Sequence, residues 1–150
     1  MNAEKVLVGI RSILPDTQIN TNPDDLYDAA ADRYKKYAKA KKVLDVPSPI
    51  AIVYPKSVEE VSQLLVFCNE NLVNVIPRGG KTATEGGLEN WKEITVVIDT
   101  LHLDQIIKID EYNMQATVQA GVELQVLEVW WQQEVLVSFQ HCTVESKTWL

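Results

Sequence analysis

Apolar and polar residues follow different patterns along the chain, and these patterns predict its elements. Over residues 1–14 the apolar positions between Val6 and Leu14 recur at roughly helical spacing, which predicts a short helix. The polar stretch DTQINTNPDD at 16–25 is interpreted as a linker. The segment from 24 to 42 is rich in Ala, Lys and Tyr, so it is expected to be helical or partly irregular.

The most regular pattern is a strand, a helix and a second strand in the middle of the chain. Residues 50–53, IAIV, form a short apolar run bounded by prolines, as in a buried strand. Ser57 and Glu60 have the spacing of a capping box, and they precede a helix with one apolar face that should end near 69–71. A short strand over 73–76 follows. This β-α-β pattern predicts parallel strands joined by a right-handed crossover.

Three further segments rich in Val, Ile or Thr predict strands at 95–99, 105–110 and 115–120, with a hairpin turn between the last two. These strands are expected to be partly antiparallel. Gly121 then opens a segment with the pattern of an amphipathic helix, and a strand is expected at 135–139. The predicted fold class is α+β, with a small parallel β-α-β layer joined to a partly antiparallel sheet.

Composition and charge narrow the classes of function. The chain has 150 residues, of which 46% are hydrophobic, enough for one ordinary core. Its 14 basic and 21 acidic residues give a formal net charge of -7, which disfavours a general affinity for nucleic-acid phosphates or anionic membranes. Six of the basic residues fall between 33 and 42 and are interpreted as a solvated helix face, not as a nucleic-acid site.

No apolar window is long enough to span a bilayer, and the N-terminus lacks the features of a secretory signal, so a cytoplasmic location is expected. Cys68 and Cys142 have no metal-ligand spacing. We therefore expect reduced thiols and no metal site. His102 and the adjacent pair His141 and Cys142 are interpreted as structural, so no catalytic residue is assigned.

The stretch PRGGKTATEGG at 77–87 carries the candidate chemistry. Glycines let the backbone approach a ligand closely, so such a loop can direct successive N–H groups at a phosphate. The alternative is purely structural: Gly79 and Gly80 form one tight turn, and Gly86 and Gly87 another. The stretch is not a P-loop, because that motif requires glycine where Val75 stands, and it has no G-x-G-x-x-G pattern.

Three sequence blocks occur in the order and spacing of a known family. They are PKSVEEV at 55–61, VIPRGGKT at 75–82 with the glycines at 86 and 87, and ATVQAGVEL at 116–124. Over about 49–128 the chain resembles the first half of the FAD-binding domain of the vanillyl-alcohol oxidase-like (PCMH-type) flavoproteins. That group includes glycolate oxidase flavoprotein subunits and D-lactate dehydrogenases.

The resemblance implies that the glycine-rich loop wraps the FAD pyrophosphate. The cofactor contacts that it implies are Arg78, Gly79, Gly80, Lys81, Thr82, Ala83, Gly86, Gly87 and Gly121. Gly121 would close the adenine side of the FAD site. The alternative is that it only begins a helix and contacts no ligand. Some members have, where Lys81 stands, a histidine bonded covalently to flavin, so any FAD here should be non-covalent. Ala83 and Glu85 also depart from the family pattern, and an inward Glu85 would weaken phosphate binding.

The resemblance also divides the chain. Residues 1–48 are an N-terminal helical segment and linker, 49–128 the first half of the FAD-binding domain, and 129–150 a divergent or truncated tail. The implied function is an N-terminal FAD-binding fragment of an oxidoreductase that in full length transfers a hydride from a 2-hydroxy acid to FAD.

Two alternatives stand beside this function. One is a non-catalytic remnant that acts as a binding or assembly module. The other is a phosphate-binding module unrelated to flavin, anchored by Arg78 and Lys81. Exposed tryptophans at 130 and 131 would favour self-association, or a partner that supplies the missing half.

Overall fold

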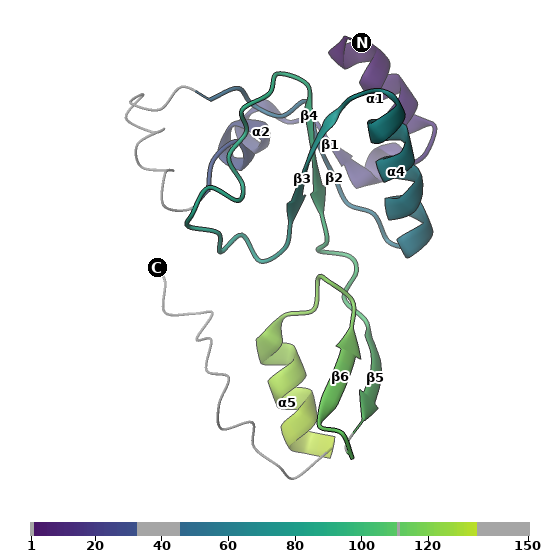
Figure 1. The fold of residues 1–150 in the computed structure, drawn as a ribbon, viewed down its shortest axis with the longest axis vertical. Helices are drawn as coiled ribbons and strands as arrows, with labels where there is room; N and C mark the ends of the chain where they lie inside the picture. Colours follow the sequence, from purple (N-terminus) through teal and green to yellow (C-terminus); the bar gives the residue numbers. More distant parts are fainter. Residues whose placement is uncertain (1, 33–45, 111, 135–150) are drawn as a thin grey trace. The chain divides into compact units, whose positions relative to one another are not determined.

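The computed structural model describes residues 2–32, 46–110 and 112–134. The chain forms two compact units, Met1–His102 and Leu103–Leu150, which are described separately (Figure 1). The predicted strand at 135–139, the basic stretch at 33–42, and the pair His141 and Cys142 lie outside the described residues.

A four-stranded sheet forms the centre of the first unit. Its strand order is β1 (Ile19–Asn20), β2 (Ala51–Val53), β4 (Thr95–Asp99) and β3 (Asn74–Arg78). Strands β2 and β3 both run parallel to β4, which lies between them. The prediction of two parallel strands is therefore confirmed, although they are not neighbours. All five residues of β4 are buried, as expected for a strand covered on both faces.

The stretch interpreted as a linker contributes to this sheet, which corrects that interpretation. It contains a 3-10 turn at Asp16–Gln18, the edge strand β1 and the start of α2 (Pro23–Ala29). Gln18 joins the stretch to the strand that follows it in the sheet. Its carbonyl accepts a hydrogen bond from the Tyr54 N–H at 2.9 Å, and its side-chain amide donates to the Tyr54 carbonyl at 2.9 Å.

Helices α1 (Ala3–Arg11) and α4 (Val58–Glu70) pack on one face of the sheet (Figure 1). The predicted cap of α4 is present: the Ser57 hydroxyl accepts from the Glu60 N–H at 3.1 Å. The Glu60 carboxylate accepts instead from the Lys56 N–H, at 2.7 Å. The core on this face contains Val6, Ile10, Leu64, Cys68, Val53 and Val96. Burial raises the pKa of the Cys68 thiol, which favours its protonated form.

Gly9 lets α1 pack closely against α4. A Cβ atom built on Gly9 would overlap the ring of Phe67. Alanine is favoured over glycine inside a helix by about 1 kcal/mol, but overpacking costs ~1–3 kcal/mol. We expect Gly9→Ala to lower the free energy of unfolding by up to about 2 kcal/mol in urea denaturation. In a Phe67→Leu background the same change should become neutral or stabilising. A more stable single variant would contradict this packing.

Helix α2 and the glycine-rich loop cover the opposite face of the sheet. Ala29 and Leu88 pack there against Ile52, Ile76 and Val97 of the three parallel strands. This second core is smaller than the first. It attaches the loop to the sheet, and so it determines where the candidate site lies.

The second unit contains an antiparallel hairpin of β5 (Ile106–Asp110) and β6 (Gln115–Val118), followed by α5 (Leu124–Glu134). The antiparallel part of the predicted fold is therefore this separate sheet, whereas 95–99 joins the parallel one. At the hairpin turn the Asp110 carboxylate accepts from the backbone and side-chain N–H groups of Asn113, each at 3.0 Å. These bonds hold the pKa of Asp110 below its ordinary value.

Candidate functional site

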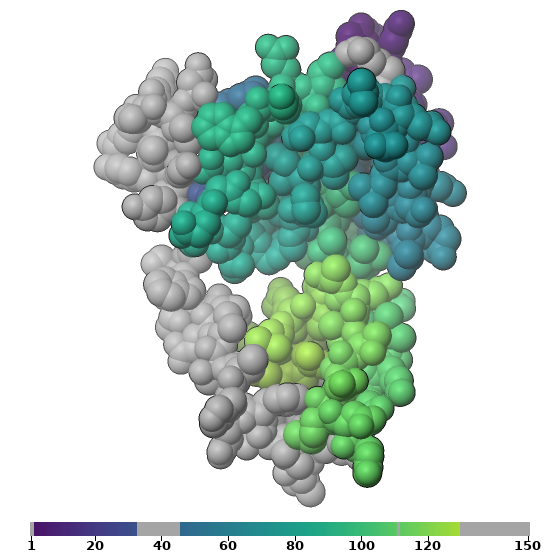
Figure 2. All heavy atoms as spheres, in the orientation of Figure 1, coloured from purple at the N-terminus to yellow at the C-terminus, as the bar shows by residue number. Residues whose placement is uncertain are grey.

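The glycine-rich loop leaves the carboxyl end of β3 and returns to β4. Arg78 is the last residue of β3, and Gly79 begins the loop. Ligands of open parallel sheets commonly bind outside the carboxyl ends of the strands, which is where this loop lies. Figure 2 shows the atoms of the loop, in teal green, at the surface of the first unit.

The far end of the loop is held by hydrogen bonds to distant parts of the chain. The fully buried Asp32 accepts from the Gly86 N–H at 2.6 Å. Gly86 has a φ of +89°, a backbone conformation that favours glycine. The buried Asn90 donates its backbone N–H to the Ala30 carbonyl at 3.0 Å and its side-chain amide to the Pro47 carbonyl at 2.8 Å. The sequence contained no local signal for Asp32 or Asn90, because their partners lie far along the chain.

A hollow of about 530 Å³, called here the loop hollow, opens over the loop. Its wall brings together six of the nine residues implied by the resemblance: Gly79, Gly80, Lys81, Thr82, Ala83 and Gly87. Arg78 and Gly86 do not line it. Gly121 belongs to the second unit, where its N–H donates to the Leu103 carbonyl at 2.8 Å.

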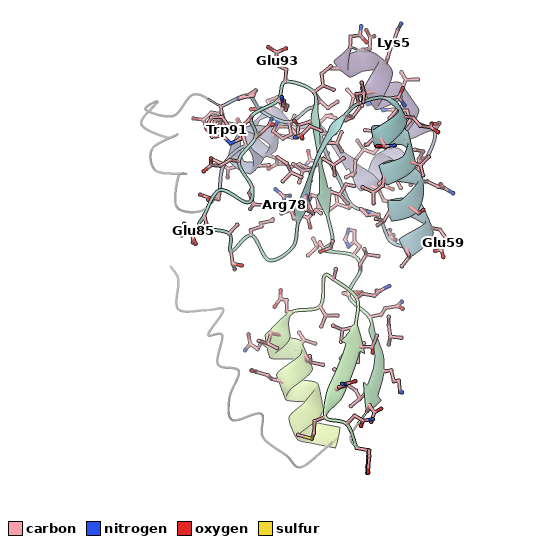
Figure 3. The ribbon with its side chains drawn as sticks, in the orientation of Figure 1. Lys5, Glu59, Arg78, Glu85, Trp91 and Glu93 are labelled. Atoms are coloured by element: carbon pink, nitrogen blue, oxygen red, sulfur yellow. The ribbon has the colours of Figure 1, made fainter. Side chains whose placement is uncertain are left out.

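Within the described part of the chain, no group accepts a hydrogen bond from the N–H groups of residues 79–85. Successive unpaired N–H groups around a concavity form an anion-binding nest. Glu85 also lines the loop hollow, but it is exposed, and its carboxylate accepts from the Thr84 hydroxyl at 3.3 Å (Figure 3). The N–H groups of residues 79–85 are therefore available as donors to a ligand.

Arg78 has a structural partner that the sequence did not reveal. Its Nε donates to Oδ2 of Asp99 at 2.7 Å, across the β3 and β4 register that pairs these two residues. Both side chains are buried, with exposed fractions of 8% and 2%. The second carboxylate oxygen of Asp99 accepts from the Leu101 N–H at 3.0 Å. This ion pair joins the end of β3, where the loop starts, to the end of β4.

Lys81 adopts a left-handed backbone conformation with a φ of +59°. Side chains other than glycine are disfavoured there by about 1–2 kcal/mol. We expect Lys81→Gly to raise the free energy of unfolding by up to about 1 kcal/mol and Lys81→Ala not to raise it. Both variants remove an exposed ammonium, so both should weaken FAD binding by about two- to fivefold. Urea denaturation and FAD titration measure the two effects, and an alanine variant more stable than the glycine variant would contradict the backbone argument.

The described residues contain no group of three or more His, Cys, Asp or Glu side chains placed to hold a metal ion. No helix in the same part of the chain is both long and apolar enough to cross a membrane.

A mostly parallel sheet with a glycine-rich loop of unpaired N–H groups at its carboxyl edge is typical of the nucleotide- or dinucleotide-binding class of proteins. The model of the FAD binding domain family matches residues 49–145. The chain belongs to this family of FAD binding domains, which confirms the resemblance seen in the sequence.

Sequence similarity to named proteins supports the same family. The chain is 41% identical over 119 residues to an uncharacterized FAD-linked oxidoreductase, YgcU, of Escherichia coli, a match that covers 79% of this chain and 25% of that protein. It is 40% identical over 81 residues to the glycolate oxidase subunit GlcD of Bacillus subtilis, covering 49% of this chain and 16% of that protein. The chain therefore spans about a quarter or less of the length of these two relatives.

Solved structures show the same fold. Alkyldihydroxyacetonephosphate synthase superposes with a TM-score of 0.78 at 20% identity, covering 89% of this chain and 25% of that chain. A substrate-bound p-cresol methylhydroxylase superposes with a TM-score of 0.68 at 20% identity, covering 87% of this chain and 24% of that chain. At this level of identity the likeness concerns the fold alone.

Proposed function

We propose that the glycine-rich loop binds the pyrophosphate of FAD without a covalent bond. The observation that carries this proposal is the set of unpaired N–H groups at 79–85 around the loop hollow. A pyrophosphate has about two negative charges. Backbone N–H groups directed at it stabilise these charges through hydrogen bonds, without a charged side chain. The exposed Lys81 adds one positive charge beside the nest.

Each part of the loop has a separate task in this proposal. The residues 79–83 and Gly87 contact the phosphates, and the Thr82 hydroxyl offers a further donor. The bond from Gly86 to Asp32 holds the far end of the loop in position. Lysine at 81 cannot form a histidyl link, so the bond to flavin is non-covalent. FAD, when bound, supplies the hydride-accepting chemistry.

The activity of the whole protein is proposed from its relatives. Curated relatives include a glycolate oxidase subunit and a mitochondrial D-lactate dehydrogenase of Saccharomyces cerevisiae, which is 30% identical over 115 residues. We propose that this chain is the cofactor-binding part of a protein that oxidises a 2-hydroxy acid of that type. The division at 48 and 128, a cytoplasmic location and self-association stay predictions from the sequence, as does the role of Gly121.

Retention of FAD tests the function directly. The purified chain is mixed with excess FAD, passed through a desalting column, and measured by visible absorbance and by flavin fluorescence. The expected result is bound flavin that is released on denaturation, which also shows that the bond is non-covalent. A folded chain that retains no FAD and binds no pyrophosphate would overturn the proposal and favour the non-catalytic binding module.

A further inference from the structure

A second hollow lies on the same face of the sheet, between α2 and the ends of β2 and β3. It has a volume of about 520 Å³ and is called here the α2 hollow. Gly80, Lys81 and Leu88 line both this hollow and the loop hollow. The two hollows are therefore adjacent, and a ligand longer than a pyrophosphate can occupy both.

Arg78 brings cationic donors to the wall of the α2 hollow. Its Nε is bound to Asp99, which holds the guanidinium plane in one orientation. Within the part of the chain that the structure describes, its two terminal nitrogens have no hydrogen-bond acceptor, although the side chain is only 8% exposed. These nitrogens are not among the enclosed polar atoms of the described residues, so an anionic ligand in the hollow can reach them. A charged acceptor makes the stronger hydrogen bond with a guanidinium.

The wall contributed by α2 has the opposite chemistry. Asp25 and Asp28 line it with carboxylates, which accept hydrogen bonds and donate none. Asn20 positions Asp25 by donating from its side-chain amide to Oδ2 at 2.7 Å. The floor is apolar and is formed by Ile52 and Leu88. A ligand that fits both walls carries an anion at one end and hydroxyl groups at the other.

We propose that the α2 hollow is a sugar subsite of the cofactor site and receives the sugar next to the pyrophosphate. Arg78 binds the phosphate end, and Asp25 accepts hydrogen bonds from the sugar hydroxyls. This inference rests on the proposed FAD site. FAD has a sugar on each side of its pyrophosphate, the adenosine ribose and the ribityl chain. Both present the same sugar phosphate chemistry to this hollow.

The direction in which FAD affinity changes when Asp25 is removed shows whether Asp25 binds a sugar hydroxyl or only repels the pyrophosphate. An Asp25 that only lies near the pyrophosphate repels it, so its removal would tighten binding. An Asp25 that accepts from a hydroxyl stabilises the complex, so its removal weakens binding. Asp24 provides a matched control: it is also exposed in the first turn of α2, carries the same charge, and does not line the hollow.

The test measures FAD affinity by titration for the wild-type chain, Asp25→Ala and Asp24→Ala, with circular dichroism melting of each. We expect Asp25→Ala to weaken FAD binding about five- to tenfold and Asp24→Ala to change it less than twofold. Inorganic pyrophosphate, which has no sugar, should bind Asp25→Ala at least as tightly as wild type. If Asp25→Ala melts early, Asp25→Asn replaces it and is expected to weaken binding in the same direction.

Equal FAD affinities for Asp25→Ala and Asp24→Ala, or tighter binding by Asp25→Ala, would overturn the sugar subsite and leave the pyrophosphate site intact. Absence of both FAD and pyrophosphate binding by the wild-type chain would overturn the proposed function as well. ADP and flavin mononucleotide then assign the sugar. A weaker ADP complex of Asp25→Ala identifies the adenosine ribose, and a weaker flavin mononucleotide complex identifies the ribityl chain.

Discussion

Replacing Gly80 with valine is expected to abolish FAD retention while the chain stays folded. In the free protein a Cβ at position 80 would have its nearest neighbour, Cγ2 of Thr82, at 3.9 Å, an ordinary contact. The φ of Gly80 is not positive, so its backbone conformation suits other residues. The protein itself therefore has room for a Cβ atom at position 80. A bound phosphate has no such room, because the loop backbone must approach it directly.

The expected loss is large because several donors act together. A branched side chain at 80 holds the phosphates away from the neighbouring N–H groups, and each charge-assisted hydrogen bond contributes about 1.5–3 kcal/mol. Loss of two such bonds corresponds to a decrease in FAD affinity on the order of 100-fold or more. Equilibrium titration with FAD measures the loss, and urea denaturation of the variant should match the wild-type chain.

Gly86 provides the contrasting control. Its φ of +89° is unfavourable for alanine, and a Cβ there would lie 3.4 Å from the Glu89 carboxylate. Gly86→Ala should therefore lower the free energy of unfolding by about 1–2 kcal/mol, which Gly80→Val should not do. Wild-type FAD affinity in a folded Gly80→Val chain would rule out close contact between the loop backbone and the cofactor.

Asp99→Ala is expected to destabilise the first unit by about 3–5 kcal/mol, because it leaves the buried Arg78 guanidinium without its carboxylate. Asp99 is 1% exposed, so little water can replace the lost partner. The substitution also removes the acceptor of the Leu101 N–H. Urea denaturation followed by circular dichroism measures the change in the free energy of unfolding.

A double variant separates the effect of losing the Arg78–Asp99 ion pair from the effect of losing side-chain packing. Arg78→Met combined with Asp99→Leu removes both charges and keeps apolar volume in the same place. Such replacements of buried ion pairs are often neutral or stabilising, so the double variant should be more stable than Asp99→Ala. It should also bind FAD less tightly than wild type, because Arg78 lines the α2 hollow. An Asp99→Ala chain of wild-type stability would show that this ion pair contributes little.

The β-α-β core could be predicted because its signals are local. The apolar run at 50–53, the cap at Ser57 and the β-branched residues of 95–99 each report on a few neighbouring positions. The structure places β2, α4 and β4 at nearly those residues. Edge strand β1 was missed because its two residues lie in a polar stretch, and only pairing with β2 makes them a strand.

In the candidate site, too, only the features with local signals could be predicted from the sequence. The glycine-rich stretch directly follows the residues of β3 in the chain, so its position at the end of a strand and its capacity for phosphate follow from local sequence. The partners that hold it do not. Asp32 lies 54 positions before Gly86, and Asp99 lies 21 positions after Arg78. Nothing in the sequence around either position distinguishes these aspartates from the other acidic residues of a chain with 21 of them.

The sequence by itself therefore determined the family, the parallel β-α-β unit, the capped helix α4 and the phosphate loop, because caps, glycines and hydrophobic periods act over a few residues. Only the tertiary structure decided that β4 lies between β2 and β3, that Arg78 pairs with Asp99, and that α2 forms the second wall of a hollow beside the loop. These features depend on which distant segments pack together, and packing selects among many pairings that local preferences leave equally favourable.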